Sequence, residues 1–302
     1  MNALTMLSPQ QTAELLPYDA LCDAIAAASI DYMAGRIVSP ERQVLPLQQG
    51  GVLLSMPATG ADIGMHKLVN VCPGNGSKNL PTIHGVVSVY DGESGRPLLL
   101  LDGPTVTAHR TAAVSLLAMR TLAGQPVARI AIIGCGRQAA AHLEAIAALY
   151  PGCRVDIHGR NAEEAALFAQ AHRHLPLVCV PASGEVAEDV TVVITLTTSL
   201  QPVYHQAARP ERLLIGVGAF RPDMAEYAPL PIHGSQIFID DPIGARHEAG
   251  DLIQAGIDWE NVASLADAVN GVIDPARPKL FKSVGTAAWD LAAARCALNS
   301  LR

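Results

Sequence analysis

The sequence predicts an α/β protein in which a doubly wound parallel sheet is joined to a second domain of mixed α+β structure. Three observations predict this class. In the second half of the chain, short apolar strands alternate with helices. Residues 40–101 consist of short runs of Val, Leu and Ile that are broken by Gly, Pro and Asn. A length of 302 residues suits two domains. Half of the residues are hydrophobic and 16% are charged, so a sizeable core can form, which excludes wholesale disorder.

The first part of the chain predicts two helices, then an antiparallel sheet, then a third helix, in that order along the sequence. A Ser-Pro-Gln-Gln run at Ser8 is typical of a helix start, and a second helix is expected over 18–34. The sheet region covers about 40–101, with a hairpin turn at 91–95. A further helix is expected over about 105–122.

The second part predicts the parallel sheet. Helical segments at 138–149 and 162–172 separate the first strands, and an Ala-rich helix is expected over about 285–301. The expected strands are 129–133, 154–158, 177–180, 190–195, 213–217 and 236–240.

The composition excludes several classes of protein. A net charge of −7 leaves no strongly basic surface for nucleic acid. Apolar runs stay far short of the ~18 residues of a spanning helix, and the first basic residue is Arg36, so we expect neither a membrane span nor a targeting peptide. The six cysteines are dispersed, and no metal-binding constellation occurs, so we expect no metal and a reducing cytoplasm.

A strand, a glycine turn and a helix start form a dinucleotide fingerprint at residues 129–139. Gly134 permits the tight turn, Gly136 lets the backbone approach a pyrophosphate, and Ala139 keeps the helix close to the sheet. The helix start then offers N–H donors to the phosphates. The alternating units that follow favour a functional interpretation over a merely structural turn, and therefore a Rossmann-type domain.

The end of the second strand bears on the choice of cofactor. An NAD enzyme usually places an acid there for the ribose 2′-OH, whereas this chain has Gly159 and Arg160. Arg160, with help from Arg137, is suited to a 2′-phosphate, so NADPH is expected and NADH remains possible. Two alternatives stay open, namely that Asp156 is the ribose ligand and that Arg160 is a solvated loop cation.

Two cations fall on apolar faces. Strand alternation places Lys67 with Ile63, Met65 and Val69, where it needs a counter-anion or a path to water, or else lies on an edge strand. Helical spacing places Arg110 in an apolar stripe, where a nearby anion must offset the cost of burial. That anion is either a substrate carboxylate or an internal salt-bridge partner.

Several of these segments resemble the ornithine cyclodeaminase/mu-crystallin family, in the family's order and over nearly the whole chain. The matching pieces are Met65-His66-Lys67, Leu80–Gly85, Thr107–Ala113, Gly134–Ala139, Gly218–Glu226 and Phe281–Gly285. The Arg-Thr-Ala-Ala and Lys-Ser-Val-Gly pieces are much more specific than the glycine fingerprint.

The resemblance implies a domain organisation and a site. A substrate-binding and dimerisation domain would cover 1–112 with 285–302, and a Rossmann dinucleotide-binding domain 113–284, in a homodimer. Arg42, Lys67 and Arg110 would hold the carboxylate of the substrate, with Thr82 orienting a neighbouring group. The residues expected to contact the cofactor are Thr111, Gly134, Gly136, Arg137, Gln138, Ala139, Gly159, Arg160, Asn161, Thr197, Ser283 and Val284.

One departure from the family pattern separates its activities. The catalytic Asp of the cyclodeaminases should align with Phe220, and Asp223 lies three residues further on, as in the ketimine reductase branch. The expected activity is therefore NADPH-dependent reduction of Δ1-pyrroline-2-carboxylate or Δ1-piperideine-2-carboxylate to L-proline or L-pipecolate. Lys67, His84, Asp223 and bulk water remain open as the proton source.

Three rival functions remain. A cyclodeaminase would release ammonia from ornithine with bound NAD⁺. An enzyme like alanine dehydrogenase would oxidise an open-chain amino acid. A non-enzymatic protein like the crystallins would bind NADPH without consuming it.

Overall fold

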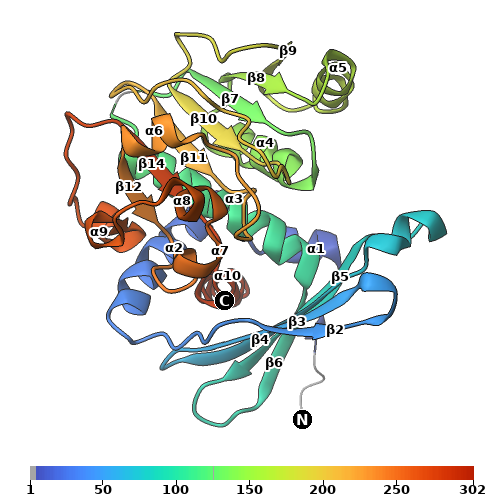
Figure 1. Ribbon diagram of the computed structural model, residues 1–302. Coiled ribbons are helices and arrows are strands. Elements are labelled where there is room, and N and C mark those ends of the chain that lie inside the picture. The colour runs from blue at the N-terminus through green and yellow to red at the C-terminus, as the bar shows by residue number, and fades with distance from the viewer. Residues whose placement is uncertain (1–4, 125) are drawn as a thin grey trace. The chain divides into compact units, whose positions relative to one another are not determined.

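The computed structural model describes residues 5–124 and 126–302. The chain divides into two compact units, Met1–Thr111 with Thr286–Arg302 and Ala112–Gly285, and each predicted domain border lies within one residue of these limits. The division falls inside one helix, α3 (Gly103–Leu122). Each unit has a sheet of its own (Figure 1).

The first unit is built on a six-stranded sheet in the order β1-β6-β5-β4-β3-β2. Neighbours from β2 to β6 are antiparallel, as predicted, and β1 pairs with β6 in parallel. The strands are β1 (Thr5–Met6), β2 (Gln43–Pro46), β3 (Val52–Thr59), β4 (Ile63–Val71), β5 (Ile83–Asp91) and β6 (Pro97–Asp102), and two 3₁₀ turns cover Gln48–Gly50 and Pro73–Lys78.

Three helices complete the first unit. They are α1 (Pro9–Glu14), α2 (Tyr18–Met33) and α10 (Ala287–Ser300). Helix α1 begins with the predicted capping box, in which Ser8 accepts from the backbone of Gln11 and the Gln11 side chain accepts from the backbone of Ser8. Helix α10 packs on α2 and on the inner face of β3, β4 and β5. Its residues 287–294 are all buried, which makes it the central helix of this unit.

The second unit is the predicted parallel sheet, with eight strands in the order β13-β12-β14-β11-β10-β7-β8-β9. The strands are β7 (Arg129–Ile133), β8 (Arg154–His158), β9 (Val178–Ala182), β10 (Val192–Thr195), β11 (Leu213–Gly216), β12 (Gln236–Ile239), β13 (Ala263–Ser264) and β14 (Lys279–Lys282). The helices are α4 (Arg137–Leu149), α5 (Ala162–Ala171), α6 (Pro229–His233), α7 (Ala245–Glu248), α8 (Gly250–Ala255) and α9 (Leu265–Val269), with a 3₁₀ turn at Trp259–Asn261. The α/β class with a doubly wound sheet and a second α+β unit is thus confirmed.

Sequence patterns did not reveal β14. This strand lies between β11 and β12 and pairs with both in parallel. A lysine stands at each end of the strand, Lys279 and Lys282, so the sequence shows no short apolar run here. Both lysines are nevertheless buried. Among the described residues, no helix combines the length and apolarity needed to cross a membrane.

Candidate active site

Lys67 lies in the interior of the first unit's sheet. Strand β4 has a partner on each side, β3 and β5, so the edge-strand interpretation of Lys67 is wrong. Alternation along β4 places Lys67 between the buried side chains of Met65 and Val69, and the residue is 2% exposed. A buried ammonium requires an anion close by.

Asp290 of helix α10 supplies that anion, and it also lies beside Arg110. The Lys67 Nζ donates a hydrogen bond of 2.6 Å to Asp290 Oδ2, and Arg110 Nε lies 3.3 Å from Asp290 Oδ1. The side chains of Lys67, Arg110 and Asp290 are 3%, 9% and 0% exposed. The structure therefore brings the two predicted cations together on one carboxylate, and the internal salt bridge that was one of the two interpretations of Arg110 is present.

The ion cluster retains capacity for another anion. Within the described residues Lys67 donates one hydrogen bond, although an ammonium has three N–H groups. In the same part of the chain, Arg110 Nε and Asp290 Oδ1 have no hydrogen-bond partner of good geometry. Two positive charges face one negative charge, so the cluster has an excess of one positive charge.

Burial alters the proton affinity of Lys67. Loss of hydration, the charge of Arg110 and the charge of Arg42 together lower its pKa from 10.5 to about 8, against the attraction of Asp290. A pKa this close to neutrality suits a group that both carries charge and exchanges protons.

The other predicted residues of this unit are more accessible. Arg42 directly precedes β2 and is half-buried, and its charge acts on Lys67. Thr82 and His84 are exposed, on either side of the first residue of β5. Thr111 is 6% exposed in helix α3, one residue after Arg110. The buried pair of cations is thus the best-defined group among the predicted residues of this unit.

The predicted phosphate turn of the second unit has the required backbone. Gly134 has φ of +124°, and a Cβ there would lie 2.7 Å from the carbonyl oxygen of Leu196. Its amide donates to the carbonyl of His158 at 2.8 Å, which joins the ends of β7 and β8. Only glycine meets both requirements of this turn.

Gly136 leaves space at the start of helix α4. It is the N-cap residue, no side chain caps the helix, and a Cβ on Gly136 would meet no atom within 4 Å. In the first turn, Ala139 is buried, Arg137 is exposed, and the buried Gln138 Oε1 has no partner among the described residues. Free N–H donors beside open space fit the pyrophosphate of a dinucleotide.

The end of β8 combines a cation with a carboxylate. Arg160 is exposed, and its Nη2 lies 2.7 Å from Glu164 Oε1, while Glu164 Oε2 accepts from the Arg160 backbone at 2.7 Å. A Cβ on Gly159 would lie 2.9 Å from the amide nitrogen of Ala165, so the backbone here lies close to helix α5. Asn161 is the N-cap of α5 and accepts from the Glu164 amide. Arg160 uses Nε and Nη2 for Glu164, and its side chain is 88% exposed, so a ligand can reach the guanidinium while this pair is in place.

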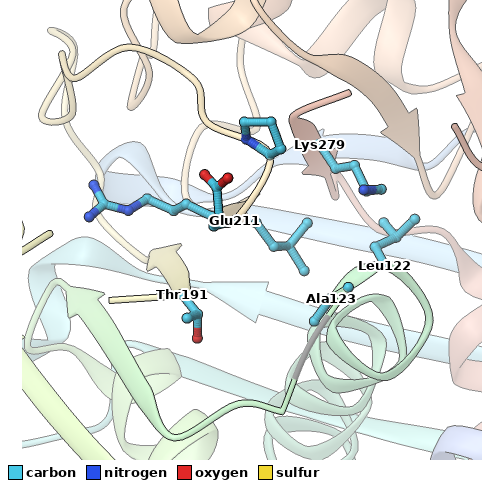
Figure 2. A pocket seen from close by; sticks show the side chains of 9 residues that line it. Leu122, Ala123, Thr191, Glu211 and Lys279 are labelled. Carbon is cyan, nitrogen blue, oxygen red and sulfur yellow. The ribbon is translucent and has the colours of Figure 1, made fainter. Parts of the chain in front are cut away.

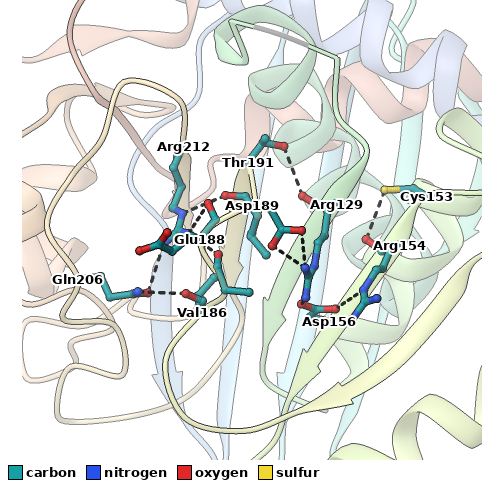
Figure 3. Close-up of polar contacts among 12 residues, drawn as sticks. Arg129, Cys153, Arg154, Asp156, Val186, Glu188, Asp189, Thr191, Gln206 and Arg212 are labelled. Atoms are coloured by element: carbon teal, nitrogen blue, oxygen red, sulfur yellow. Dashed lines mark hydrogen bonds and ion pairs between the residues drawn. The ribbon is translucent and has the colours of Figure 1, made fainter.

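Asp156 has other partners, and Figure 3 shows its contacts. Its Oδ2 accepts from Arg129 Nη2 at 2.5 Å and its Oδ1 from Arg154 Nε at 3.0 Å, while Arg129 also pairs with Asp189. Both carboxylate oxygens are therefore engaged, inside strand β8, which does not favour a role for Asp156 as the ribose ligand. The same figure shows Arg212 reaching backbone and side-chain acceptors of neighbouring loops.

Two carboxylates organise the loops at the carboxyl ends of the parallel strands. Glu226 is fully buried and accepts from the amide and hydroxyl of Thr197 and from the amide of Gly218. Asp240, after β12, accepts from the Ser283 hydroxyl at 2.7 Å and from the Val284 amide at 3.0 Å. Thr197, Ser283 and Val284, which the resemblance assigned to the cofactor, thus lie on fixed loops.

The segment that distinguishes the family's activities holds no carboxylate at position 220. Phe220 is 44% exposed. Asp223 is exposed and pairs with Arg221, whose Nη2 lies 2.8 Å from Asp223 Oδ2. The Arg221 guanidinium lowers the pKa of Asp223, which makes this carboxyl a poor proton donor at neutral pH.

A small pocket lies at the other end of the parallel sheet, as Figure 2 shows. Its lining includes Thr191, Arg212 and Lys279, which stand at the amino-terminal ends of β10, β11 and β14. Nucleotides bind at the carboxyl ends of parallel strands, where Gly134 lies. We therefore do not assign this pocket to the active site.

Sequence analysis missed three buried carboxylates that hold predicted residues in place, namely Asp290 in the first unit and Glu226 and Asp240 in the second. One signal was available for Asp290, because it is an isolated acid within the apolar run Ala287–Ala294. Glu226 and Asp240 occupy loop positions, where acids are common. Within the part of the chain that the structure describes, no group of three His, Cys, Asp or Glu residues has the arrangement of a metal site.

Comparison with known proteins agrees with these features. The model of the ornithine cyclodeaminase/mu-crystallin family matches residues 3–302. The Δ1-pyrroline-2-carboxylate/Δ1-piperideine-2-carboxylate reductase of Azospirillum brasilense is 52% identical over 305 residues, covering 99% of this chain and 98% of the relative.

Two solved structures share the fold over nearly the full length. An archaeal alanine dehydrogenase dimer with bound NAD has a TM-score of 0.88 and 25% identity, covering 98% of this chain and 95% of that chain. The Δ1-pyrroline-2-carboxylate reductase of Thermococcus litoralis, in complex with NADH and L-proline, has a TM-score of 0.86 and 26% identity, covering 98% and 97%.

Proposed function

Since the chain belongs to the ornithine cyclodeaminase/mu-crystallin family, we propose that it is an NAD(P)H-dependent reductase of cyclic imino acids. Its substrates are Δ1-pyrroline-2-carboxylate and Δ1-piperideine-2-carboxylate, and its products are L-proline and L-pipecolate. One structural observation carries this proposal, namely the buried pair of cations with an excess positive charge. The chain is also 52% identical to a reductase of these two imines.

The cations bind the carboxylate of the imine. Lys67 has N–H groups to spare, Arg110 presents a planar guanidinium beside it, and Arg42 adds a third cation at the surface. One substrate carboxylate brings the charge of the Lys67, Arg110 and Asp290 cluster to zero. Fixing the carboxylate also fixes the neighbouring C2 carbon, and such positioning accounts for a large part of catalysis.

When bound, a reduced nicotinamide would supply hydride chemistry at C2 of the imine. The C=N bond becomes a C–N bond, and the ring nitrogen takes up a proton. Of the side chains considered as its source, Lys67 is the buried one, and its pKa is lowered to about 8. His84 and Asp223 are exposed, and Asp223 is engaged with Arg221. We assign the proton to the Lys67 ammonium.

The cofactor is NADPH in preference to NADH. Arg160 follows the second strand of the parallel sheet, where an acid would bind the ribose of NADH, and it is suited to a 2′-phosphate. Arg137, exposed at the start of α4, supports the same phosphate. Glu164 lies beside Arg160 and offers an acceptor to the 2′-OH of NADH. NADH therefore also binds, and NADPH is preferred over it by a difference in affinity.

The protein acts as a homodimer in a reducing compartment, the cytoplasm. The edge strand β2 carries exposed apolar side chains, and the alanine dehydrogenase of similar fold is described as a dimer. None of the six cysteines, all of them described in the structure, is joined in a disulfide, which suits a reducing environment.

Assays of cofactor oxidation test the function. The purified protein is given NADPH or NADH with each imine, and loss of the reduced cofactor is followed by absorbance. We expect turnover with both imines and a higher kcat/KM with NADPH. Ammonia release from ornithine, oxidation of L-alanine, or NADPH binding without turnover of either imine would contradict the proposal and favour one of the three rival functions.

A further inference from the structure

The position of Asp290 raises a question that imine reduction alone does not answer. Helix α10 is buried on all sides from Ala287 to Ala294, and alanine or leucine would fill such a position without cost in charge. The chain instead places a carboxylate there, 0% exposed, between the two cations that bind the substrate. A buried carboxylate is tolerated only when its partners are held against it.

We propose that Asp290 is a positioning residue of the imino acid site, which holds the Lys67 ammonium and the Arg110 guanidinium side by side and cancels one of their two charges. This role rests on the proposed function. Asp290 Oδ2 is 2.6 Å from Lys67 Nζ and Asp290 Oδ1 is 3.3 Å from Arg110 Nε, so each oxygen serves one cation. A single carboxylate ligand then completes the charge balance, which matches the site to a monocarboxylate.

The arrangement also keeps Lys67 charged. The charged groups that act on Lys67 come from three elements: Asp290 from α10, Arg110 from α3 and Arg42 from the segment before β2. Its cross-strand partners, Met56 on β3 and Val87 on β5, carry no charge. Asp290 is therefore the anion that opposes burial and both arginines. Without it, Lys67 loses its proton at a lower pH, and the site loses half of its carboxylate clamp.

The experiment measures ligand affinity against pH. The probe is pyrrole-2-carboxylate, a planar ring acid whose nitrogen does not titrate near neutrality, and its Kd for the NADPH-saturated protein is measured by calorimetry. In the wild type, Kd should rise above the Lys67 pKa, about 8. In Asp290→Asn the rise should begin at least about one pH unit lower, because an opposite charge at this distance shifts a pKa by that much or more.

The control is Asp62→Asn. Asp62 pairs with Arg295 of the same helix α10, but it is exposed, with Arg295 Nη2 2.7 Å from Asp62 Oδ1. This variant removes one carboxylate from the unit and should leave the midpoint of the Kd curve where the wild type has it. A purely structural role of Asp290 would weaken binding equally at every pH. Coincident midpoints for Asp290→Asn and the wild type would overturn the proposal.

A second variant covers the case in which Asp290→Asn does not fold. Arg110→Gln leaves Lys67 and Asp290 as a neutral pair, so binding should weaken at every pH while the midpoint moves upward, since Arg110 lowers the Lys67 pKa. A midpoint that stays in place or falls overturns the proposal. Failure of the proposed function can be distinguished from failure of this inference. If the wild type binds pyrrole-2-carboxylate with this pH profile but reduces neither imine, only the proposed function is refuted.

Discussion

At the scale of single residues, the proposed function gives Arg110 the role of determining how tightly the imine is held. We expect Arg110→Ala to lower kcat/KM for either imine at least about thirtyfold, mainly through KM, because one partner of a buried charge pair is worth that much or more. The variant should fold, since Lys67 and Asp290 remain paired at 2.6 Å. Steady-state kinetics measure the loss, and a fluorescence titration should show NADPH affinity unchanged.

Arg36→Ala is the matched control, because Arg36 is an exposed arginine that also pairs with an aspartate, Asp31. It should retain the wild-type kcat/KM. Equal kinetics for Arg110→Ala and the wild type would remove the carboxylate clamp from the mechanism, whatever the activity of the protein.

Lys67 makes stability depend on pH in a direction opposite to that of a lysine whose pKa a salt bridge raises. Its pKa is about 8 in the fold, against 10.5 for an unperturbed lysine. Between these values the unfolded chain binds more protons than the folded one, so the free energy of unfolding rises with pH across this window. We expect the wild type to gain up to roughly 3 kcal/mol relative to Lys67→Met across it. Urea unfolding at both ends of the window measures the gain, and a constant difference would contradict a lowered pKa.

At the scale of elements, the turn between β7 and α4 depends on the absence of a side chain at Gly134. A Cβ there would lie 2.7 Å from the carbonyl oxygen of Leu196, at φ +124°. We expect Gly134→Ala to weaken NADPH and NADH alike by about tenfold or more, because a displaced turn removes phosphate contacts that both cofactors share.

Gly184→Ala separates backbone strain from the steric clash. Gly184 also has a positive φ, +74°, but no atom lies within 4 Å of its Cβ position. This control should cost about 1 kcal/mol of stability and leave cofactor affinity intact. Fluorescence titration and thermal unfolding of both variants test the distinction, and unchanged affinity in Gly134→Ala would show that the turn does not bind phosphate.

The segment after β14 is held by Asp240, so residues 283–285 have a fixed course within the second unit. Asp240 accepts from the Ser283 hydroxyl and from the amides of Val284 and Gly285. We expect Asp240→Ala to lower the free energy of unfolding by about 2–4 kcal/mol, since it leaves buried donors without partners. Asp258→Ala, which removes an exposed cap at Glu260, should cost about 1 kcal/mol. Equal losses in chemical denaturation would contradict a special role for Asp240.

At the scale of the whole molecule, local patterns were sufficient to predict the two kinds of sheet and the glycine turn. Apolar runs and turn residues are local properties, so strands such as β7 and β8 were predicted at their observed limits. Strand β14 was missed because its place between β11 and β12 depends on distant pairing. Asp290 was missed for the same reason, since its partner Lys67 is 223 positions away. Periodicity shows which face a cation lies on, but it does not show which anion meets it there.

Assembly is the last property that the exposed surface predicts. Strand β2 is an edge of the six-stranded sheet, and Val44 and Leu45 on it are 55% and 54% exposed. An exposed apolar edge strand can pair with other chains and cause aggregation. Pairing with a second copy of the chain in a closed dimer covers this edge. We expect sedimentation equilibrium to give twice the chain mass of 31.7 kDa.

Leu45→Glu should shift that equilibrium toward monomer, because a carboxylate at an apolar contact loses its hydration on association. Leu167→Glu, at a leucine that is 61% exposed on α5 of the other unit, should remain a dimer. Each Lys67, Arg110 and Asp290 cluster lies wholly within one chain's first unit. A monomeric Leu45→Glu should therefore still bind pyrrole-2-carboxylate, and loss of that binding on dissociation would show that the partner chain contributes to the site.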